Sequence, residues 1–210
     1  MVRRHIALSA VAALCVGCAP DQPAPTGAEV RVPLFATAGR RDFNLGTHLR
    51  GEEEVFTPAV PDGPTPADSR AQGQAIFRVS DDGSTVDFRL IASNIDNVFM
   101  AHIHCGRFGE NGPVSVWLYP VIGPTGAPAP PGSGPQNGVL ASGTFSPTGI
   151  VCPASAVGQD MPLLDAMRAG LTYVNVHTND GVDPPNTGPG DFPGGEIRGQ
   201  LDHASSHANK

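Results

Sequence analysis

Three histidines and one glutamate are the residues of this sequence whose types and spacing suggest chemistry. His102 and His104 form a His-x-His pair in AHIHCG, His177 lies near the end of TYVNVHT, and Glu196 lies in GEIRGQL. Alternate side chains of an extended strand point to the same face, so the paired imidazoles are expected to lie side by side. Three imidazoles and a carboxylate suit zinc or copper. The metal-site hypothesis is therefore His102, His104 and His177, with Glu196 as a fourth ligand.

A hydrogen-bonded network without a metal is the alternative use of the same side chains. Buried polar groups need partners, and a Glu196–Arg198 pair with histidines bonded to neighbouring carbonyls would fix the strand register. The guanidinium of Arg198 would also repel a cation beside it. We therefore favour the network, and keep the zinc or copper site, which would make a metalloprotein, perhaps a redox-active one, as the alternative. The predicted polar cluster comprises His102, His104, Asn175, His177, Glu196 and Arg198.

Motifs for other chemistry are weak or absent in the sequence. It contains no G-x-S-x-G, P-loop or H-E-x-x-H pattern, so we expect a protein without enzymatic activity. Asp180, Asp183 and Asp191 could bind calcium, but their spacing is not that of an EF-hand, and a solvated acidic loop is the better interpretation. Trp117 and Tyr119 share a strand face and either stack on a ligand or fill the core; we favour the core.

Short alternating runs separated by turn residues must position these side chains. Eight such runs predict strands, and DDG at 81–83 predicts a hairpin turn between two of them. One helix is predicted over 160–170, capped by Asp160 and ended by Gly170. This pattern predicts an all-β, antiparallel sandwich or barrel with one short helix. Long Gly-, Pro- or Asp-rich loops are expected at 57–70, 120–138 and 179–194.

The N-terminus predicts export from the cytoplasm. Two arginines precede an apolar run of about a dozen residues, which is typical of a signal peptide and too short to span a membrane. The run ends at Cys18 and resembles the lipobox of bacterial lipoproteins, whose cysteine carries the lipid. Cleavage after Ala19 is the alternative, disfavoured by Pro20. We expect a signal peptide at 1–18, a Pro/Ala-rich tether at 19–42 and a flexible tail at 203–210.

The expected location is therefore extracytoplasmic, with the chain lipid-anchored to the bacterial cell envelope, or secreted if the anchor is absent. The membrane is then a partner through the anchor. In an oxidising compartment Cys105 and Cys152 are expected to form a disulfide, with two buried thiols as the alternative. The formal net charge of −7 argues against nucleic acid as a partner.

Four fragments in order make the sequence resemble the CHRD domain, the repeated module of the developmental antagonist chordin that also occurs alone in microbial secreted proteins. They are LRGEEEVFTPAV, AIFRVSDDGSTVDFRL, AHIHCGRFGENGPVSVWLY and YVNVHTNDG with PGGEIRGQL. The resemblance covers about residues 43–202 and implies an immunoglobulin-like Greek-key sandwich or barrel. The cysteine-rich modules that bind growth factor in chordin are missing, so that function is not expected. We expect a non-enzymatic binding or structural module, with an extracellular protein or glycan as its ligand.

Overall fold

The computed structural model describes residues 44–56, 63–120 and 128–203. The predicted signal peptide, Cys18 and the tether lie outside the described residues. So do parts of the loops 57–70 and 120–138, and residues 204–210 of the predicted tail. No helix among the described residues is long and apolar enough to cross a membrane.

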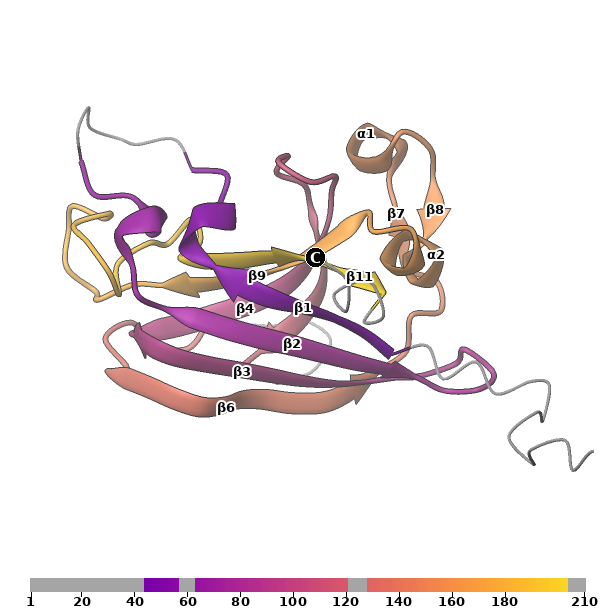
Figure 1. The fold of residues 1–210 in the computed structure, drawn as a ribbon, viewed down its shortest axis with the longest axis horizontal. Helices are drawn as coiled ribbons and strands as arrows, with labels where there is room; N and C mark the ends of the chain where they lie inside the picture. Colours follow the sequence, from indigo (N-terminus) through magenta and orange to yellow (C-terminus); the bar gives the residue numbers. More distant parts are fainter. Residues whose placement is uncertain (1–43, 57–62, 121–127, 204–210) are drawn as a thin grey trace, which may run out of the picture. The chain divides into compact units, whose positions relative to one another are not determined.

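The main sheet is antiparallel and has nine strands: eight follow the order β5-β4-β9-β10-β1-β2-β3-β6, and the short β11 (Asp202–His203) pairs with β1 (Figure 1). The edge strands β5 and β6 approach each other, so the sheet is a nearly closed barrel. All eight predicted strands are present, and the all-β prediction is confirmed. The strands are β1 (Asn44–Arg50), β2 (Gln72–Val79), β3 (Val86–Asp96), β4 (Val98–Cys105), β5 (Val114–Tyr119), β6 (Pro135–Phe145), β9 (Thr172–Thr178) and β10 (Ile197–Gln200).

The helical region differs in detail from the prediction. Met161 and Pro162 are extended and pair with β7, so the predicted helix begins only at Leu163. Asp160 does not cap that helix, because its carboxylate accepts a hydrogen bond from the backbone N–H of Ala154 at 2.8 Å. The remaining short elements are η1 (Gly51–Glu53), η2 (Pro66–Asp68), β7 (Val151–Cys152), α1 (Ala154–Val157), β8 (Met161–Pro162), α2 (Leu163–Arg168) and β11 (Asp202–His203), which pairs with β1.

Side chains on alternate positions of the strands fill the barrel interior. On β4, Ala101, Ile103 and Cys105 are buried there, and on β9 Val174 and Val176 lie beside them. This is the expected consequence of a period-2 pattern with one apolar face. The opposite face of β9 is also buried, because every residue of this strand is buried. The polar row predicted from alternation therefore lies beneath loops and is not exposed to water.

A disulfide joins Cys105 at the end of β4 to Cys152 in β7, as predicted from the sequence. Both cysteines are buried, with exposed fractions of 1% and 0%. β7 pairs only with β8 in a separate two-stranded sheet. The disulfide is therefore a direct covalent link between the barrel and the segment that carries α1 and α2, which lie together in Figure 1.

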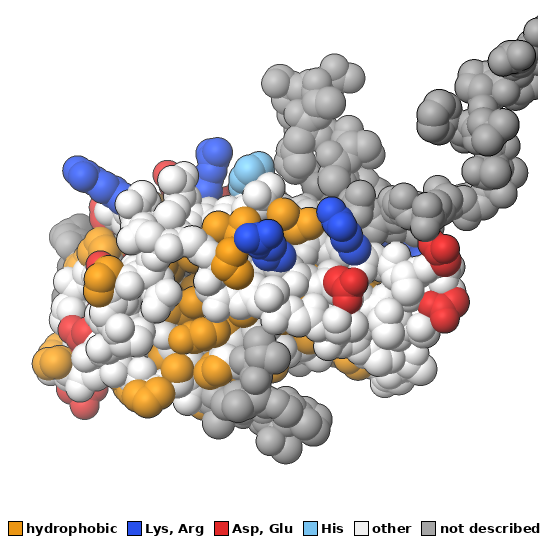
Figure 2. Space-filling view, turned by 90° about the horizontal axis from the view of Figure 1, so that it is seen from below, with side chains coloured by type: hydrophobic (Ala, Val, Ile, Leu, Met, Phe, Trp, Pro, Cys, Tyr) orange, Lys and Arg blue, Asp and Glu red, His pale blue; other side chains and the backbone are white. Residues whose placement is uncertain are grey.

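Figure 2 shows one face of the domain with its charged and hydrophobic side chains. Hydrophobic side chains gather on part of this face, and the Lys and Arg side chains stand apart from one another. Nucleic acid binding requires a continuous basic surface. The face in Figure 2 does not present one.

Candidate metal centre

The three predicted histidines meet on the buried outer face of β4 and β9. These strands are neighbours in the sheet, with His102 opposite Asn175 and His104 opposite Tyr173. Each histidine offers one ring nitrogen, and these three nitrogens lie within 4.8 Å of one another. Metal–nitrogen bonds of about 2.0–2.1 Å place ligand nitrogens about 3.3–3.6 Å apart. Ring shifts of about 1 Å would therefore bring the three nitrogens around one ion.

Two backbone carbonyls set the orientation of two of these rings. Nδ1 of His104 lies 2.9 Å from the carbonyl oxygen of Gly112, and Nδ1 of His177 lies 2.9 Å from that of Pro193. A carbonyl only accepts, so each Nδ1 carries the proton and donates it. Nε2 of each ring then holds a lone pair. Metal-binding histidines commonly have this arrangement, in which the nitrogen that does not bind the metal donates to a carbonyl.

His102 completes the cluster through a direct contact between imidazoles. Its Nδ1 lies 3.2 Å from Nε2 of His177. Because that Nε2 holds a lone pair, Nδ1 of His102 donates to it in the metal-free protein. Nε2 of His102 and Nε2 of His104 are then buried acceptors, and neither has a hydrogen-bond partner among the described residues. The network favoured from the sequence leaves these two nitrogens without partners, at a cost of about 1–3 kcal/mol each.

Burial keeps the three rings neutral at pH 7. Their exposed fractions are 2% for His102, 8% for His104 and 6% for His177. Burial lowers the pKa of His102 to about 3, with smaller contributions from the charges of the other two imidazoles. It also lowers the pKa of His104, and that of His177 to about 4. Neutral imidazole is the form that binds a metal.

Aromatic rings surround the histidines. The ring of Trp117 lies 4.2 Å from that of His102, and Tyr173 stacks on His104 at 4.8 Å with an angle of 8° between the planes. Phe99 approaches His177 edge-on at 6.4 Å. The prediction that Trp117 fills the core describes only part of its role, because this half-buried side chain packs against the outer-face cluster.

Glu196 and Arg198 do not form the ion pair that strand alternation suggested. Arg198 donates to Asn111 Oδ1 and to the carbonyls of Arg107 and Glu110, and lies 3.5 Å above the ring of Tyr173. The carboxylate of Glu196 accepts hydrogen bonds from elsewhere, namely from Ser69 Oγ, Thr178 Oγ1 and the backbone N–H of Gly190. The group of side chains with metal-ligand geometry comprises, within the described ranges, the three histidines without Glu196.

Asn175 joins the cluster to a glutamate that the sequence did not single out. Its Nδ2 donates to Oε2 of Glu54 at 3.1 Å, while Oδ1 of Asn175 and Oε1 of Glu54 are buried without partners in the described part of the chain. Gly195 covers this pair with a φ of +135°, and a Cβ there would lie 2.7 Å from each of these two oxygens. Glycine at this position of PGGEIRGQL is therefore required both by backbone conformation and by space.

A surface pocket of about 380 Å³ adjoins this side of the cluster. Its lining includes Glu54, which is bonded to Asn175, and Pro193, which is bonded to His177. Phe56 and Asn111 line it as well. Glu54 and Pro193 therefore each connect the pocket to a residue of the polar face of β9 through one hydrogen bond. A metal site needs such an approach from solvent.

Replacing Glu54 with glutamine is expected to stabilise the protein at alkaline pH. Burial raises the pKa of Glu54 from 4.5 to about 8, against the opposing effects of Arg198 and Asn175. The folded state then holds one more proton than the unfolded state between pH 4.5 and 8, so this group's contribution is fully present below pH 4.5 and is lost as the pH rises through 8. Glu54→Gln stays neutral at every pH. We expect a gain of about 1–3 kcal/mol at pH 8 and almost none at pH 4.5.

Denaturant unfolding of both proteins at the two pH values measures this difference. The histidines titrate in both proteins, so their effects cancel in the comparison. Glu52→Gln is the matched control, because Glu52 lies two residues earlier and is exposed. A gain at pH 8 that is no larger than at pH 4.5, or equal to that of the control, would show that Glu54 is ionised in the folded protein.

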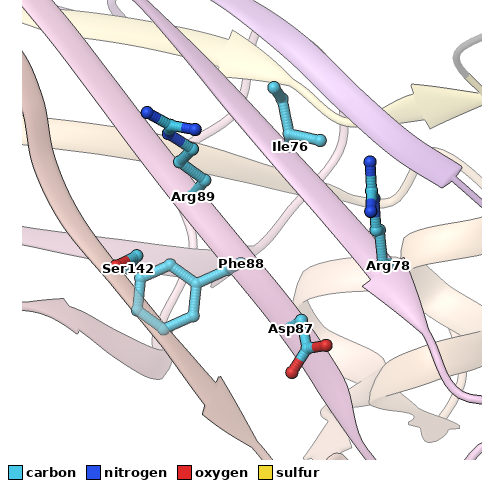
Figure 3. A pocket seen from close by; sticks show the side chains of 6 residues that line it. All are labelled: Ile76, Arg78, Asp87, Phe88, Arg89 and Ser142. Atoms are coloured by element: carbon cyan, nitrogen blue, oxygen red, sulfur yellow. The ribbon is translucent and has the colours of Figure 1, made fainter.

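A second pocket, of about 360 Å³, lies on β2, β3 and β6 (Figure 3). Arg78 and Arg89 lie on either side of Ile76, with Phe88 and Asp87 nearby in the same view. None of these residues contacts the histidines. Asp87 and Arg78 are opposite each other across β2 and β3, and Asp87 also accepts a hydrogen bond from Thr144.

The acidic loop uses its carboxylates to hold its own backbone. Asp191 accepts hydrogen bonds from the backbone N–H and the hydroxyl of Thr187, and Asp180 accepts one from the backbone N–H of Val182. Asp191 is buried, contrary to the expectation of a solvated loop. Its partners explain the burial. The loop's aspartates do not form a metal-ligand group within the described residues.

Comparison with known proteins gives one match. A family model described as the CHRD domain matches residues 45–201. No curated protein matches the chain. No solved structure matches it either.

Proposed function

The chain belongs to the CHRD domain family, and from this premise we propose that it is a non-enzymatic, extracytoplasmic binding module whose ligand is a transition-metal ion. His102, His104 and His177 would bind the ion. The observation that carries the proposal is the group of three buried histidines whose ligand nitrogens lie within 4.8 Å of one another, together with the buried Nε2 of His104, which has no partner within the described residues. An ion would bind the unpartnered lone pair of His104 and would replace the contact between His102 and His177.

Two of the three histidines already present a lone pair to an ion. The carbonyls of Gly112 and Pro193 hold the Nδ1 protons of His104 and His177, so both Nε2 lone pairs are available. Only His102 must change its tautomer, because its Nδ1 donates to Nε2 of His177 in the metal-free protein. Binding through Nδ1 would move that proton to Nε2 of the same ring. Imidazole ligands suit zinc and copper, and we propose one of these as the ion.

Alanine at His102, His104 or His177 is expected to abolish stoichiometric metal binding in a folded protein. The expected loss of affinity exceeds the roughly 10–100-fold that removal of an outer partner of a ligand typically costs. Elemental analysis after dialysis against zinc or copper should give one ion per wild-type chain. Trp117 is the single tryptophan and lies 4.2 Å from His102, so its fluorescence reports binding directly.

The matched control is His48→Ala, which removes an exposed histidine from β1. It should bind metal like the wild type. Circular dichroism establishes that each variant is folded. If the wild type retains no metal and Trp117 emission does not respond, the metal function is wrong. Loss of folding in the histidine variants without any metal binding by the wild type would favour the hydrogen-bonded network instead.

We further propose that the chain is a lipoprotein of the bacterial cell envelope, anchored through Cys18. The support is the signal-like sequence that ends at this cysteine and the disulfide between Cys105 and Cys152, which suits an oxidising compartment. A Cys18→Ser variant should lose labelling by palmitate and leave the membrane fraction. Unchanged membrane association of this variant would contradict the anchor and favour another means of retention.

A further inference from the structure

We propose that the three-histidine site selects the cuprous ion, Cu⁺, over Zn²⁺. This inference rests on the proposed metal-binding function and names the ion within it. Three observations carry it: the ligands bear no negative charge, a buried guanidinium lies nearby, and the walls are aromatic.

The ligand set consists of neutral groups. The carboxylate of Glu196 is occupied by Ser69, Thr178 and Gly190 and is absent from the group with metal-ligand geometry. Cys105 follows His104 directly in β4, but its sulfur is bonded to that of Cys152 and faces the barrel interior. Within the described residues, therefore, no thiolate or carboxylate belongs to the ligand group. The whole charge of the ion stays on a buried complex.

Arg198 adds a positive charge on the same side of the sheet. Its guanidinium lies 3.5 Å above the ring of Tyr173, whose other neighbour is the ring of His104 at 4.8 Å. Arg198 is 2% exposed, and it donates hydrogen bonds to the side-chain amide of Asn111 and to the backbone carbonyls of Arg107 and Glu110. These acceptors are uncharged, and the carboxyl groups whose charge acts on Arg198 are those of Glu53 and Glu54. Burial raises the pKa of Glu54 to about 8, so at pH 7 Glu53 is the carboxylate that opposes the guanidinium. Because the guanidinium is buried, salt screens it only weakly.

The charge of the ion therefore decides the electrostatic cost of binding. The cost of transferring an ion from water into a poorly polarisable site rises with the square of its charge, so a divalent ion costs about four times as much as a monovalent ion of similar size. Repulsion by Arg198 doubles from Cu⁺ to Zn²⁺. Both terms favour the monovalent ion.

The preferred coordination numbers of the two ions also favour Cu⁺ over Zn²⁺ at this site. Zinc takes four ligands, so three histidines would leave one position for water. The protons of that water would need acceptors, and the rings of Trp117, Tyr173 and Phe99 around the histidines offer none, which leaves the unpartnered Oδ1 of Asn175, opposite His102, as the nearby acceptor. Cu⁺ has the same filled d shell as Zn²⁺ and is satisfied with three nitrogen ligands.

Paired titrations of the purified chain test the inference. Cu⁺ is supplied without oxygen and in competition with bathocuproine disulfonate, Zn²⁺ in competition with a zinc chelator, and Trp117 fluorescence reports both. Because both ions have filled d shells, the comparison depends on charge and coordination number. We expect Cu⁺ to bind about 100-fold or more tightly than Zn²⁺.

Asn111→Asp tests the role of Arg198 without shortening that side chain. Asn111 is exposed, and its Oδ1 accepts from Arg198 at 3.1 Å, so a carboxylate there would compensate the guanidinium charge. The ratio of the Zn²⁺ dissociation constant to the Cu⁺ dissociation constant should fall roughly 3–10-fold. Asn137→Asp adds the same charge at an exposed position of β6 and should leave the preference unchanged.

The outcomes separate the inference from the function on which it rests. Zinc binding as tight as Cu⁺ binding, or tighter, would overturn the selectivity and leave the metal site intact. Binding of neither ion would overturn both. Equal effects of Asn111→Asp and Asn137→Asp would overturn the electrostatic explanation.

Discussion

Removal of the Cys105–Cys152 disulfide is expected to lower the free energy of unfolding by about 2–5 kcal/mol. The two cysteines are 47 residues apart in the chain. Closing a loop of that length reduces the entropy of the unfolded chain enough to account for about 4 kcal/mol at 25 °C. The effect should be near the upper end of the range, because both cysteines are buried in the folded state and their replacement also removes packed side-chain contacts.

The double variant Cys105→Ala/Cys152→Ala measures this effect by denaturant unfolding. Its Tm should fall by about 5–15 °C. Wild-type protein in reductant is the matched control: it should lose a similar amount, and the variant should not respond to reductant. A loss below about 1 kcal/mol would show that packing of α2 holds this segment without the covalent link.

The location of the disulfide predicts that the β7–α2 segment loses its structure first when the disulfide is removed. Leu163, Ala166 and Met167 of α2 are fully buried against the core. The segment from β7 to α2 is not hydrogen-bonded into the main sheet as a strand. Without the disulfide it depends on these apolar contacts and on loop hydrogen bonds. Amide exchange in α2 should therefore increase before exchange in β4 and β9.

The barrel strands were predictable because each has one face toward the core. Val86, Phe88 and Leu90 of β3 alternate with polar residues, and all three are buried as expected. β6 was predicted only in its second half. It begins at Pro135, contains Gly138 with a φ of +118°, and pairs irregularly with β3. Irregular pairing breaks the period of two, so the sequence carries no clear alternation there.

The histidine cluster was predictable as residues but not as a site. Alternation places His102 and His104 on one face, whereas their proximity to His177 depends on the pairing of β4 with β9, about 70 residues later in the chain. The acceptors for His104 and His177 are backbone carbonyls, which have no signature in residue type. Three successive glutamates in GEEEVF likewise gave no indication that Glu54 is the one beside Asn175.

The predicted Glu196–Arg198 pair shows the limit of arguments from strand alternation. Glu196 precedes β10, which begins at Ile197. The side chain of Glu196 therefore need not follow the alternation of side chains along the strand. It turns toward Thr178 and Gly190, while Arg198 turns toward Tyr173. A residue at a strand end can follow the loop geometry, which the sequence does not specify.

Glutamine at Glu196 is expected to lower the free energy of unfolding by about 2–4 kcal/mol without removing the metal ligands. The buried carboxylate accepts from Ser69 Oγ at 2.5 Å, Thr178 Oγ1 at 2.6 Å and the N–H of Gly190 at 2.9 Å. An amide has one acceptor oxygen instead of two, so its NH₂ group would face Ser69 Oγ, and that hydroxyl would have to accept from it instead of donating. The carboxylate thereby connects the C-terminal end of η2 and the 179–194 loop to β9.

This variant decides between the two roles considered for Glu196. If the glutamate only holds the loops, the folded variant should keep one ion per chain and its affinity should fall far less than that of His177→Ala. Glu52→Gln, at an exposed site, is the matched control for stability and should change it by less than about 0.5 kcal/mol. Normal stability with loss of the ion would instead make Glu196 a ligand, and would require its carboxylate to leave all three donors on binding.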